Sequence, residues 1–424
     1  MRFQSTLIPL AACCTLAAAV VAQPVRFVKR AGVTWPAPFA TPPRSMTPQP
    51  WIDALNAAVA TGKIPSIPRS QNVNGPLKYP DGVNPADPSV CNWSYSQCEG
   101  PNDITSAPQG QVAINFDDGP SQGTNELLNF LQTNSQSATH FLIGSNILTN
   151  QDAFQQMAKS PLHHLADHTW SHPSFITALS NEDVVAEIGW CMEIIFQLSG
   201  KVPAFWRPPQ GDADNRIRAI AEHVFGLTLV SWSGDSNDWE LREGSGSVGD
   251  SPAQVCTNIH QAFGSLTSQG KGVLVLEHEL TDQSVHAFEW CTWPLVQQFN
   301  LQARNIAQLG DTPGKPWYAN ALNNTAPVSA QQGILSMQRQ EIIASAGSGN
   351  QTRTMSSTTA SSLTISTSAA SSASSHKAVA SAAPAPTSVQ IGHTSTAALS
   401  ASRSSCASAA ALLVTLSVSA AFFL

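Results

Sequence analysis

Short apolar runs alternate with amphipathic stretches between residues 108 and 308. The apolar runs have the length of strands, and the amphipathic stretches are long enough for helices. The alternation predicts a parallel sheet with crossover helices, either doubly wound or closed into a barrel, with its chemistry at the carboxyl ends of the strands. The expected strands are residues 112–116, 139–144, 163–168, 204–207, 227–233 and 272–278.

The clearest helical pattern covers residues 181–198. Apolar residues recur there at helical spacing, and acidic residues occupy the first turn. Ser180 stands at the N-cap position, and Gly200 follows the last turn. The other expected helices are residues 214–224, 253–266 and 287–308.

The two ends of the chain have compositions unlike that of a globular domain. Residues 1–22 carry an early arginine, an apolar run and small residues, which predicts a secretory signal peptide. Residues 352–403 are mostly Ser, Thr and Ala without apolar periodicity, which predicts a stalk. The apolar tail 404–424 is typical of a GPI-anchor signal, with attachment expected near Ser395 to Ser400. A tail-anchored membrane helix is the alternative interpretation of this tail.

These ends divide the chain into segments and predict its location. Between them lie a loop-rich extension (23–107), the β/α domain (108–308) and a second extension (309–351). The dibasic pair Lys29-Arg30 either ends a propeptide or contributes two surface charges. We expect a secreted protein, GPI-anchored to the outer face of the plasma membrane and the cell wall.

Cysteine usage supports an oxidising compartment. Eight cysteines are present, and Cys13, Cys14 and Cys406 lie in the segments expected to be removed. The remaining five should mostly form disulfides and leave one thiol unpaired. Cys91 and Cys98 are the first expected pair, because they lie close together in a loop-like stretch. The sequence leaves the other connectivity open, with these further candidates: Cys191, Cys256 and Cys291.

Charge and sequons narrow the function further. The net charge is −7 and the body of the chain has no basic cluster, which disfavours nucleic-acid binding. Nothing in the sequence indicates a protein partner. Asn92, Asn323 and Asn350 each begin an N-x-Ser/Thr sequon, so N-glycans are expected there.

Ionisable residues stand at or just after the carboxyl ends of five of the expected strands. Because these strand ends meet at one edge of the sheet, their side chains are expected to form one active site. The five stretches are NFDDGP (115–120), HTWSHP (168–173), RPPQGDAD (207–214), DSNDW (235–239) and VLVLEHEL (273–280).

His168 and His172 indicate a metal site within this edge. Two imidazoles and one Asp carboxylate give three protein ligands and an open position, the arrangement of a catalytic zinc. Two histidines at this spacing also occur by chance. The neighbouring Asp117 and Asp118 favour the metal site, since one carboxylate can bind the cation while the other acts as a base. A tight turn is the alternative explanation of the two aspartates.

In this order, the five motifs resemble those of the polysaccharide deacetylases, the NodB-homology domains of carbohydrate esterase family four. The resemblance covers about residues 108–308 and is strongest to GPI-anchored fungal chitin deacetylases. It implies a distorted (β/α) barrel with a loop-rich N-terminal extension. The implied activity is metal-dependent hydrolysis of the N-acetyl groups of chitin to chitosan and acetate, in fungal cell-wall biogenesis.

The resemblance also implies a metal centre and a base. Asp118, His168 and His172 would bind one divalent metal ion, with Zn expected and Co as the alternative. Asp117 would be the general base and would contact the substrate. Arg207 would pair with Asp117 and keep it charged and oriented.

On the leaving-group side, the resemblance implies that His278 is the general acid and that Asp238 tunes its pKa. Trp239 and Leu276 would form the walls of the pocket for the acetyl methyl group. Gln210 stands where many members of the family have an aromatic residue, and its backbone N–H is expected to serve the oxyanion.

Two further expectations concern residues around the motifs. Glu277 and Glu279 flank His278, and we expect their charges to be solvated. Trp170 and Trp239 lie within motifs and are the preferred candidates for stacking on sugars. The remaining tryptophans of this region are expected in the core: Trp206, Trp232, Trp290 and Trp293.

Two other functions compete with chitin deacetylation. An acetylxylan or other polysaccharide O-acetyl esterase would use the same residues on an ester. A catalytically silent wall-binding protein would share the fold. Loss of a catalytic or ligand residue would have favoured that interpretation, but all five of these residues are present: Asp117, Asp118, His168, His172 and His278.

Overall fold

The computed structural model describes residues 32–71, 77–241, 250–311, 316–324, 327–329 and 333–335. The chain divides into two units, Met1–Arg353 and Thr354–Leu424, and every described residue belongs to the first. The predictions of a signal peptide, processing at Lys29-Arg30, a stalk, a GPI tail and a glycan at Asn350 therefore lie outside the described residues. Within the described part, no helix has both the length and the apolar character needed to cross a bilayer.

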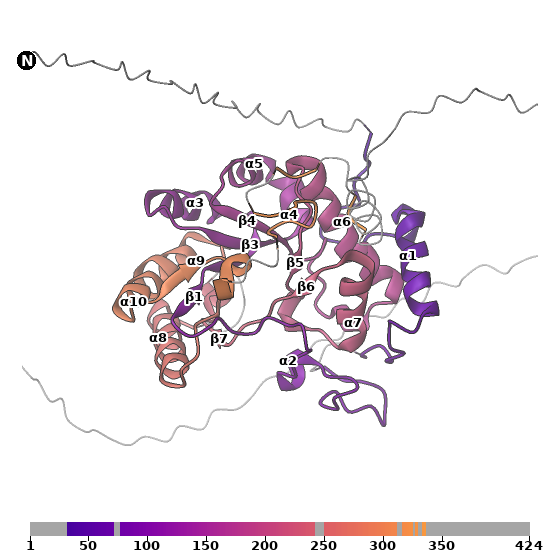
Figure 1. Ribbon diagram of the computed structural model, residues 1–424, viewed down its shortest axis with the longest axis horizontal. Coiled ribbons are helices and arrows are strands. Elements are labelled where there is room, and N and C mark those ends of the chain that lie inside the picture. Colours follow the sequence, from indigo (N-terminus) through magenta and orange to yellow (C-terminus); the bar gives the residue numbers. More distant parts are fainter. Residues whose placement is uncertain are drawn as a thin grey trace, which may run out of the picture. The chain divides into compact units, whose positions relative to one another are not determined.

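Five parallel strands in the order β2-β3-β4-β5-β6 form the central sheet (Figure 1). Two parallel pairs, β1 with β9 and β7 with β8, accompany it. The strands are β1 (Gln111–Ala113), β2 (Asn115–Gly119), β3 (Ala138–Leu142), β4 (His163–Asp167), β5 (Phe205–Trp206), β6 (Thr228–Leu229), β7 (Gly234–Asp235), β8 (Val275–Leu276) and β9 (Gln302–Arg304).

The segment after β8 extends the ring of strands back to β2. Asp117 and His278 form a parallel bridge, in which the Asp117 N–H donates to the Glu277 carbonyl at 2.9 Å. The arrangement confirms the predicted α/β fold with parallel strands and a distorted barrel. It also places the ends of β2 and β8 side by side, which brings two of the sequence motifs together.

Helices cover the sheet. The α-helices are α1 (Gln49–Ala60), α2 (Trp93–Ser96), α3 (Thr124–Thr133), α4 (Gly144–Thr149), α5 (Gln151–Lys159), α6 (Asn181–Ser199), α7 (Asn215–Ile220), α8 (Pro252–Ser268), α9 (Asp282–Ala287) and α10 (Trp293–Gln298). The short 3₁₀ and π helices are η1 (Arg44–Met46), η2 (Ile176–Ala178), η3 (Pro209–Gly211), η4 (Ala221–Phe225), η5 (Asp238–Leu241), η6 (Phe288–Thr292) and η7 (Ile306–Asp311).

Helix α6 matches its prediction closely and organises the larger core. The Ser180 hydroxyl caps it by accepting from the Asp183 N–H at 3.1 Å, and Gly200 ends it with a φ of 72°. The helix is buried on most sides because α1 of the N-terminal extension packs over it. Trp51 of α1 lies so close to Gly189 that a Cβ there would come within 2.5 Å of its ring.

The predicted helix 287–308 is wrong in its second half. The chain is helical through α10, and Asn300 then takes a φ of 50°. Residues 302–304 form β9 and pair with β1. Apolar residues continue at helical spacing into this region. The segment nevertheless pairs with the edge of β1, because tertiary pairing overrides the local pattern.

Among the described residues, two disulfides join Cys91 to Cys98 and Cys256 to Cys291. The first confirms the pair expected from sequence. The second settles the connectivity that the sequence left open, and Cys191 is the buried unpaired thiol within α6.

Candidate active site

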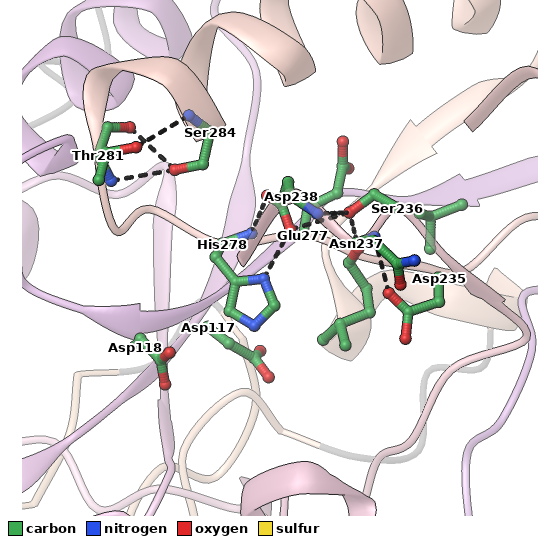
Figure 2. Close-up of polar contacts among 12 residues, drawn as sticks. Asp117, Asp118, Asp235, Ser236, Asn237, Asp238, Glu277, His278, Thr281 and Ser284 are labelled. Atoms are coloured by element: carbon green, nitrogen blue, oxygen red, sulfur yellow. Dashed lines mark hydrogen bonds and ion pairs between the residues drawn. The ribbon is translucent and has the colours of Figure 1, made fainter. Parts of the chain in front are cut away.

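The carboxyl end of β2 presents two aspartates to the same space. The register of β2 against β3 shifts between Asp117 and Gly119, and Asp118 takes a φ of 67°. An irregularity of this kind bends a strand and redirects its side chains. Figure 2 shows the carboxylates of Asp117 and Asp118 on the side of the His278 ring that faces away from Asp238.

Glu279 fills the space beside Gly119. A Cβ at Gly119 would overlap the Glu279 carboxylate, so any larger residue here forces that side chain to shift. Glu279 is fully buried and accepts from the Thr124 hydroxyl at 2.8 Å, while His140 Nδ1 lies 3.0 Å from its other oxygen. Glu277 is also buried, and burial raises its pKa to about 8. The expectation that these two glutamates are solvated is therefore wrong.

The loop after β4 aims two imidazoles at Asp118. Thr169 and His172 have φ values of 68° and 55°, which turn the chain sharply after His168. His168 Nδ1 lies 2.7 Å from the Arg207 carbonyl, which only accepts, so Nδ1 carries the proton and Nε2 is left to act as a ligand. Asp118 Oδ1 lies 3.3 Å from His168 Nε2 and 3.5 Å from His172 Nε2.

These three side chains fit a divalent cation. Their ligand atoms all lie within 4.8 Å of one another, and Asp118 Oδ1 is buried without accepting a hydrogen bond. Burial opposes ionisation of Asp118, but His172 and His168 hold its pKa well below the usual range. Two imidazole nitrogens and one carboxylate oxygen suit zinc and similar divalent metals. The structure thus brings together the three ligands proposed from sequence.

Arg207, at the end of β5, fixes the second aspartate. Its guanidinium is fully buried and donates to Asp117 Oδ1 at 2.6 Å and to Asn115 Oδ1 at 2.7 Å. It also donates to the Ser231 carbonyl at 3.0 Å. The other oxygen, Asp117 Oδ2, lies 3.7 Å from His168 Nε2 and so faces the ligand set. The role of Asn115 in holding Arg207 was not foreseen from sequence.

His278 and Asp238 form a second pair opposite these aspartates (Figure 2). Asp238 accepts from the His278 backbone N–H and lies against its Nδ1, both at 2.7 Å. Ser236 donates to the same carboxylate at 2.9 Å. Burial by itself would lower the pKa of His278, but Asp238, together with Asp118 and Asp117, raises it to about 9. The imidazole is therefore charged at neutral pH.

The predicted substrate contacts lie around this pair. Trp239 follows Asp238 in η5 and is 36% exposed, whereas Leu276 is buried in β8. Gln210 is exposed within η3 and takes a φ of 55°. The indole beside Asp238 is thus accessible, and the pocket for the acetyl methyl group stays a prediction.

Trp170 does not face the solvent, so the prediction that it stacks on sugars is wrong. Its ring is fully buried and stacks on Trp35, with centroids 6.3 Å apart. Its Nε1 donates to the Ala37 carbonyl at 3.0 Å. Trp290 is 69% exposed, so the prediction that it lies in the core is also wrong.

Trp35 and Ala37 belong to residues 33–41, which we call the N-terminal strap. The Phe39 N–H donates to the Ser145 hydroxyl at 2.8 Å, and that hydroxyl donates to the Trp170 carbonyl at 2.6 Å. Glu187 accepts from the Ser171 N–H at 2.9 Å and also bonds the Thr41 side chain. The strap therefore packs directly behind the loop that carries both histidine ligands.

The structure argues against a glycan on Asn92 of the folded domain. Its side chain is fully buried, and Nδ2 donates to Asp212 at 3.0 Å and to the Tyr79 hydroxyl at 3.2 Å. Its oxygen caps α2 by accepting from the Tyr95 N–H. The sequon at Asn323 is exposed and remains a prediction.

The chain is similar in sequence to known polysaccharide deacetylases. The family model described as polysaccharide deacetylase matches residues 105–229. Chitin deacetylase 3 of Cryptococcus neoformans is 39% identical over 294 residues, which cover 68% of this chain and 67% of the relative. Chitin deacetylase of Amylomyces rouxii is 32% identical over 238 residues, 54% of this chain and 53% of the relative. The solved structure of the chitin deacetylase from Colletotrichum lindemuthianum is 24% identical, with a TM-score of 0.44, and the match covers 51% of this chain and 94% of that one.

Proposed function

The chain belongs to the polysaccharide deacetylase family, and on this basis we propose that it hydrolyses the N-acetyl groups of chitin to give chitosan and acetate. One observation carries the proposal. A buried carboxylate held by Arg207 and a charged imidazole held by Asp238 lie next to the three-residue ligand set of Asp118, His168 and His172. The relatives at 39% and 32% identity are chitin deacetylases, which supports an amide in chitin as the substrate.

We propose that Asp118, His168 and His172 hold one divalent ion, with zinc as the expected ion and cobalt as the alternative. Such an ion, when bound, supplies Lewis acidity that lowers the pKa of water and polarises an acetyl carbonyl. The protein contributes the orientation of the ligands. The Arg207 carbonyl fixes the tautomer of His168, and the sharp turns at Thr169 and His172 fix the direction of both rings.

Asp117 is placed to act as the general base. One of its oxygens is held by Arg207, so the other, Oδ2, is directed toward the ligand set and can take the proton from the attacking water. The 2.6 Å bond from Arg207 fixes the orientation of this carboxylate. Because Arg207 is itself held by Asn115 and by backbone carbonyls, the base cannot swing out of position.

His278 is placed to act as the general acid. An amine is a poor leaving group until it is protonated, so the collapse of the tetrahedral intermediate requires a proton donor on the leaving-group side. Asp238 occupies Nδ1 of His278, which leaves the Nε2 proton for the departing nitrogen. We further propose that Trp239 and Leu276 enclose the acetyl methyl group and that the Gln210 N–H supports the oxyanion. The sugar then leaves with a free amine, and acetate is the second product.

Location and anchoring are proposed on sequence grounds. The expected signal peptide and the apolar tail support secretion followed by GPI attachment near Ser395 to Ser400. Chitin in the cell wall would then be the nearest substrate. The two competing functions are not favoured, because the identified relatives are chitin deacetylases and the acid, base and ligand positions are all filled.

The experiment that tests the proposal measures acetate released from chitin oligomers and from acetylated xylan. Each substrate is assayed with the metal-free protein and after adding back zinc or cobalt, and Asp117→Asn serves as the control. We expect metal-dependent release from the chitin oligomers that is lost in the variant. Release from xylan alone would move the substrate to an ester, and bound zinc without release from either would support the wall-binding alternative.

A further inference from the structure

Trp290 is more exposed than any other aromatic side chain among the described residues, at 69%. It lies in η6, whose neighbouring residues Phe288 and Cys291 face the core, and Cys291 is also bonded to Cys256. The backbone of this turn is thus fixed while the indole points to solvent. Burial of apolar surface does not explain why a tryptophan stands here.

The exposed indole is nevertheless held in one orientation. The ring of His286 stacks on it, with centroids 4.4 Å apart and planes 8° from parallel. His286 Nε2 lies 2.9 Å from Glu126 Oε1, so the histidine is tied to α3. A flat apolar surface that is both exposed and rigid is suited to bind a flat apolar ligand with little loss of side-chain entropy.

Two carboxylates surround this aromatic stack. Glu126, His286 and Glu289 have side-chain atoms within 4.8 Å of one another. Among the described residues, no lysine or arginine forms a salt bridge with either glutamate, and the His286 ring contacts Glu126. Partial burial and the nearby charge of Glu126 raise the pKa of Glu289, as expected for two carboxyls placed close together. A cationic ligand would relieve this repulsion.

The group lies on helices that begin beside the candidate active site. Helix α3 follows the Asp117–Asp118 end of β2, and Glu126 is its third residue. Helix α9 follows the His278 segment and packs against α3, as Figure 1 shows. Both helices start after strands whose carboxyl ends carry active-site motifs.

We propose that Trp290, Glu126 and Glu289 form a second saccharide-binding site, which holds the partly deacetylated part of a chitin chain. The indole stacks on the apolar face of a sugar ring, and the carboxylates pair with the ammonium groups of glucosamine units. The proposal rests on the proposed function, because deacetylation is what creates those ammonium groups. A chain held here by its product units stays close to the active site for further rounds.

The test measures binding of a β-1,4-linked glucosamine hexamer, which has no acetyl group to lose, and of the N-acetylglucosamine hexamer. Asp117→Asn is the background, so that neither ligand is turned over. We expect Trp290→Ala to weaken binding of the glucosamine hexamer about tenfold. The double variant Glu126→Gln and Glu289→Gln should remove the preference for glucosamine and its sensitivity to salt. Tyr95→Ala, which removes another exposed aromatic ring, should change neither affinity.

Activity provides an independent readout in the protein with Asp117 intact. Trp290→Ala should lower the rate on long, partly deacetylated chitin several-fold and leave the rate on the N-acetylglucosamine dimer unchanged. Equal affinity of wild type and Trp290→Ala for the glucosamine hexamer would overturn the proposal, as would binding that requires an added divalent ion at Glu126 and Glu289. If Trp290-dependent binding occurs without acetate release from any chitin, the proposed function fails while the binding site stands.

Discussion

Replacing Asp238 with asparagine should move the pH range in which His278 is a proton donor. The pKa of His278 is raised from the ordinary 6.5 to about 9, and Asp238 is the largest of the contributions that raise it against burial. Asparagine keeps the shape but removes the charge, so burial should draw the pKa back toward 6.5. At pH 8 a pKa of 9 leaves about 90% of the imidazole protonated, whereas 6.5 leaves about 3%, a loss of about thirtyfold.

The assay is the pH profile of kcat for acetate release from a chitin oligomer. We expect the wild-type rate to fall as pH rises through about 9, because the raised pKa keeps the acid charged below that point. The Asp238→Asn profile should fall at a distinctly lower pH. Ser236→Ala is the matched control, since it removes the hydroxyl that bonds the Asp238 carboxylate and N–H but keeps the charge of Asp238. An Asp238→Asn profile that still falls near 9 would refute the reasoning.

Three further substitutions probe the base, the ligands and the turn between them. Arg207→Lys keeps the charge but loses the guanidinium that bonds four oxygens. We expect initial rates to show a drop in kcat of at least about tenfold, and denaturant unfolding to show a loss of about 3 kcal/mol in the free energy of unfolding. Asn146→Ala removes the 2.7 Å bond to the Asp118 carbonyl and should weaken zinc binding about tenfold in competition with a chelator, whereas unchanged affinity would exclude this support. Gly119→Ala places a methyl group against the buried Glu279 carboxylate; a loss of about 1–3 kcal/mol is expected in thermal unfolding, and a neutral result would mean that Glu279 can move aside.

The sequence predicted that the motifs gather in one place because parallel strands bring them together. In a parallel sheet the carboxyl ends of neighbouring strands share one edge, which groups the motifs after β2, β4 and β5, and the Asp117–His278 bridge adds the motif after β8. The residues themselves grouped His168 and His172 with one of the two neighbouring aspartates, and the choice of Asp118 as the ligand came from the family resemblance. The pairing of Arg207 with Asp117 came from the family resemblance, and the structure gives it a distance of 2.6 Å.

The sequence alone could not predict which individual side chains are exposed. Trp170 is buried because Trp35 and Ala37 cover it, and the latter lies 133 residues away in the chain. Trp290 is exposed because its neighbours Phe288 and Cys291 take the inward positions of η6. Such outcomes depend on which remote segment covers a residue, and local periodicity carries no information about remote segments.

The N-terminal strap couples its own docking to the ordering of the loop that carries His168 and His172, although the two segments are far apart in the sequence. It packs against the loop of His168 and His172, so ordering the strap and ordering the metal ligands stabilise the same conformation. By reciprocity, whatever free energy the docked strap adds to metal binding, the bound metal must add to docking of the strap. Zinc should therefore slow proteolysis around residues 33–41, although none of those residues belongs to the ligand set. Cleavage after Arg30 would leave this coupling intact, whereas trimming past Thr41 would abolish it.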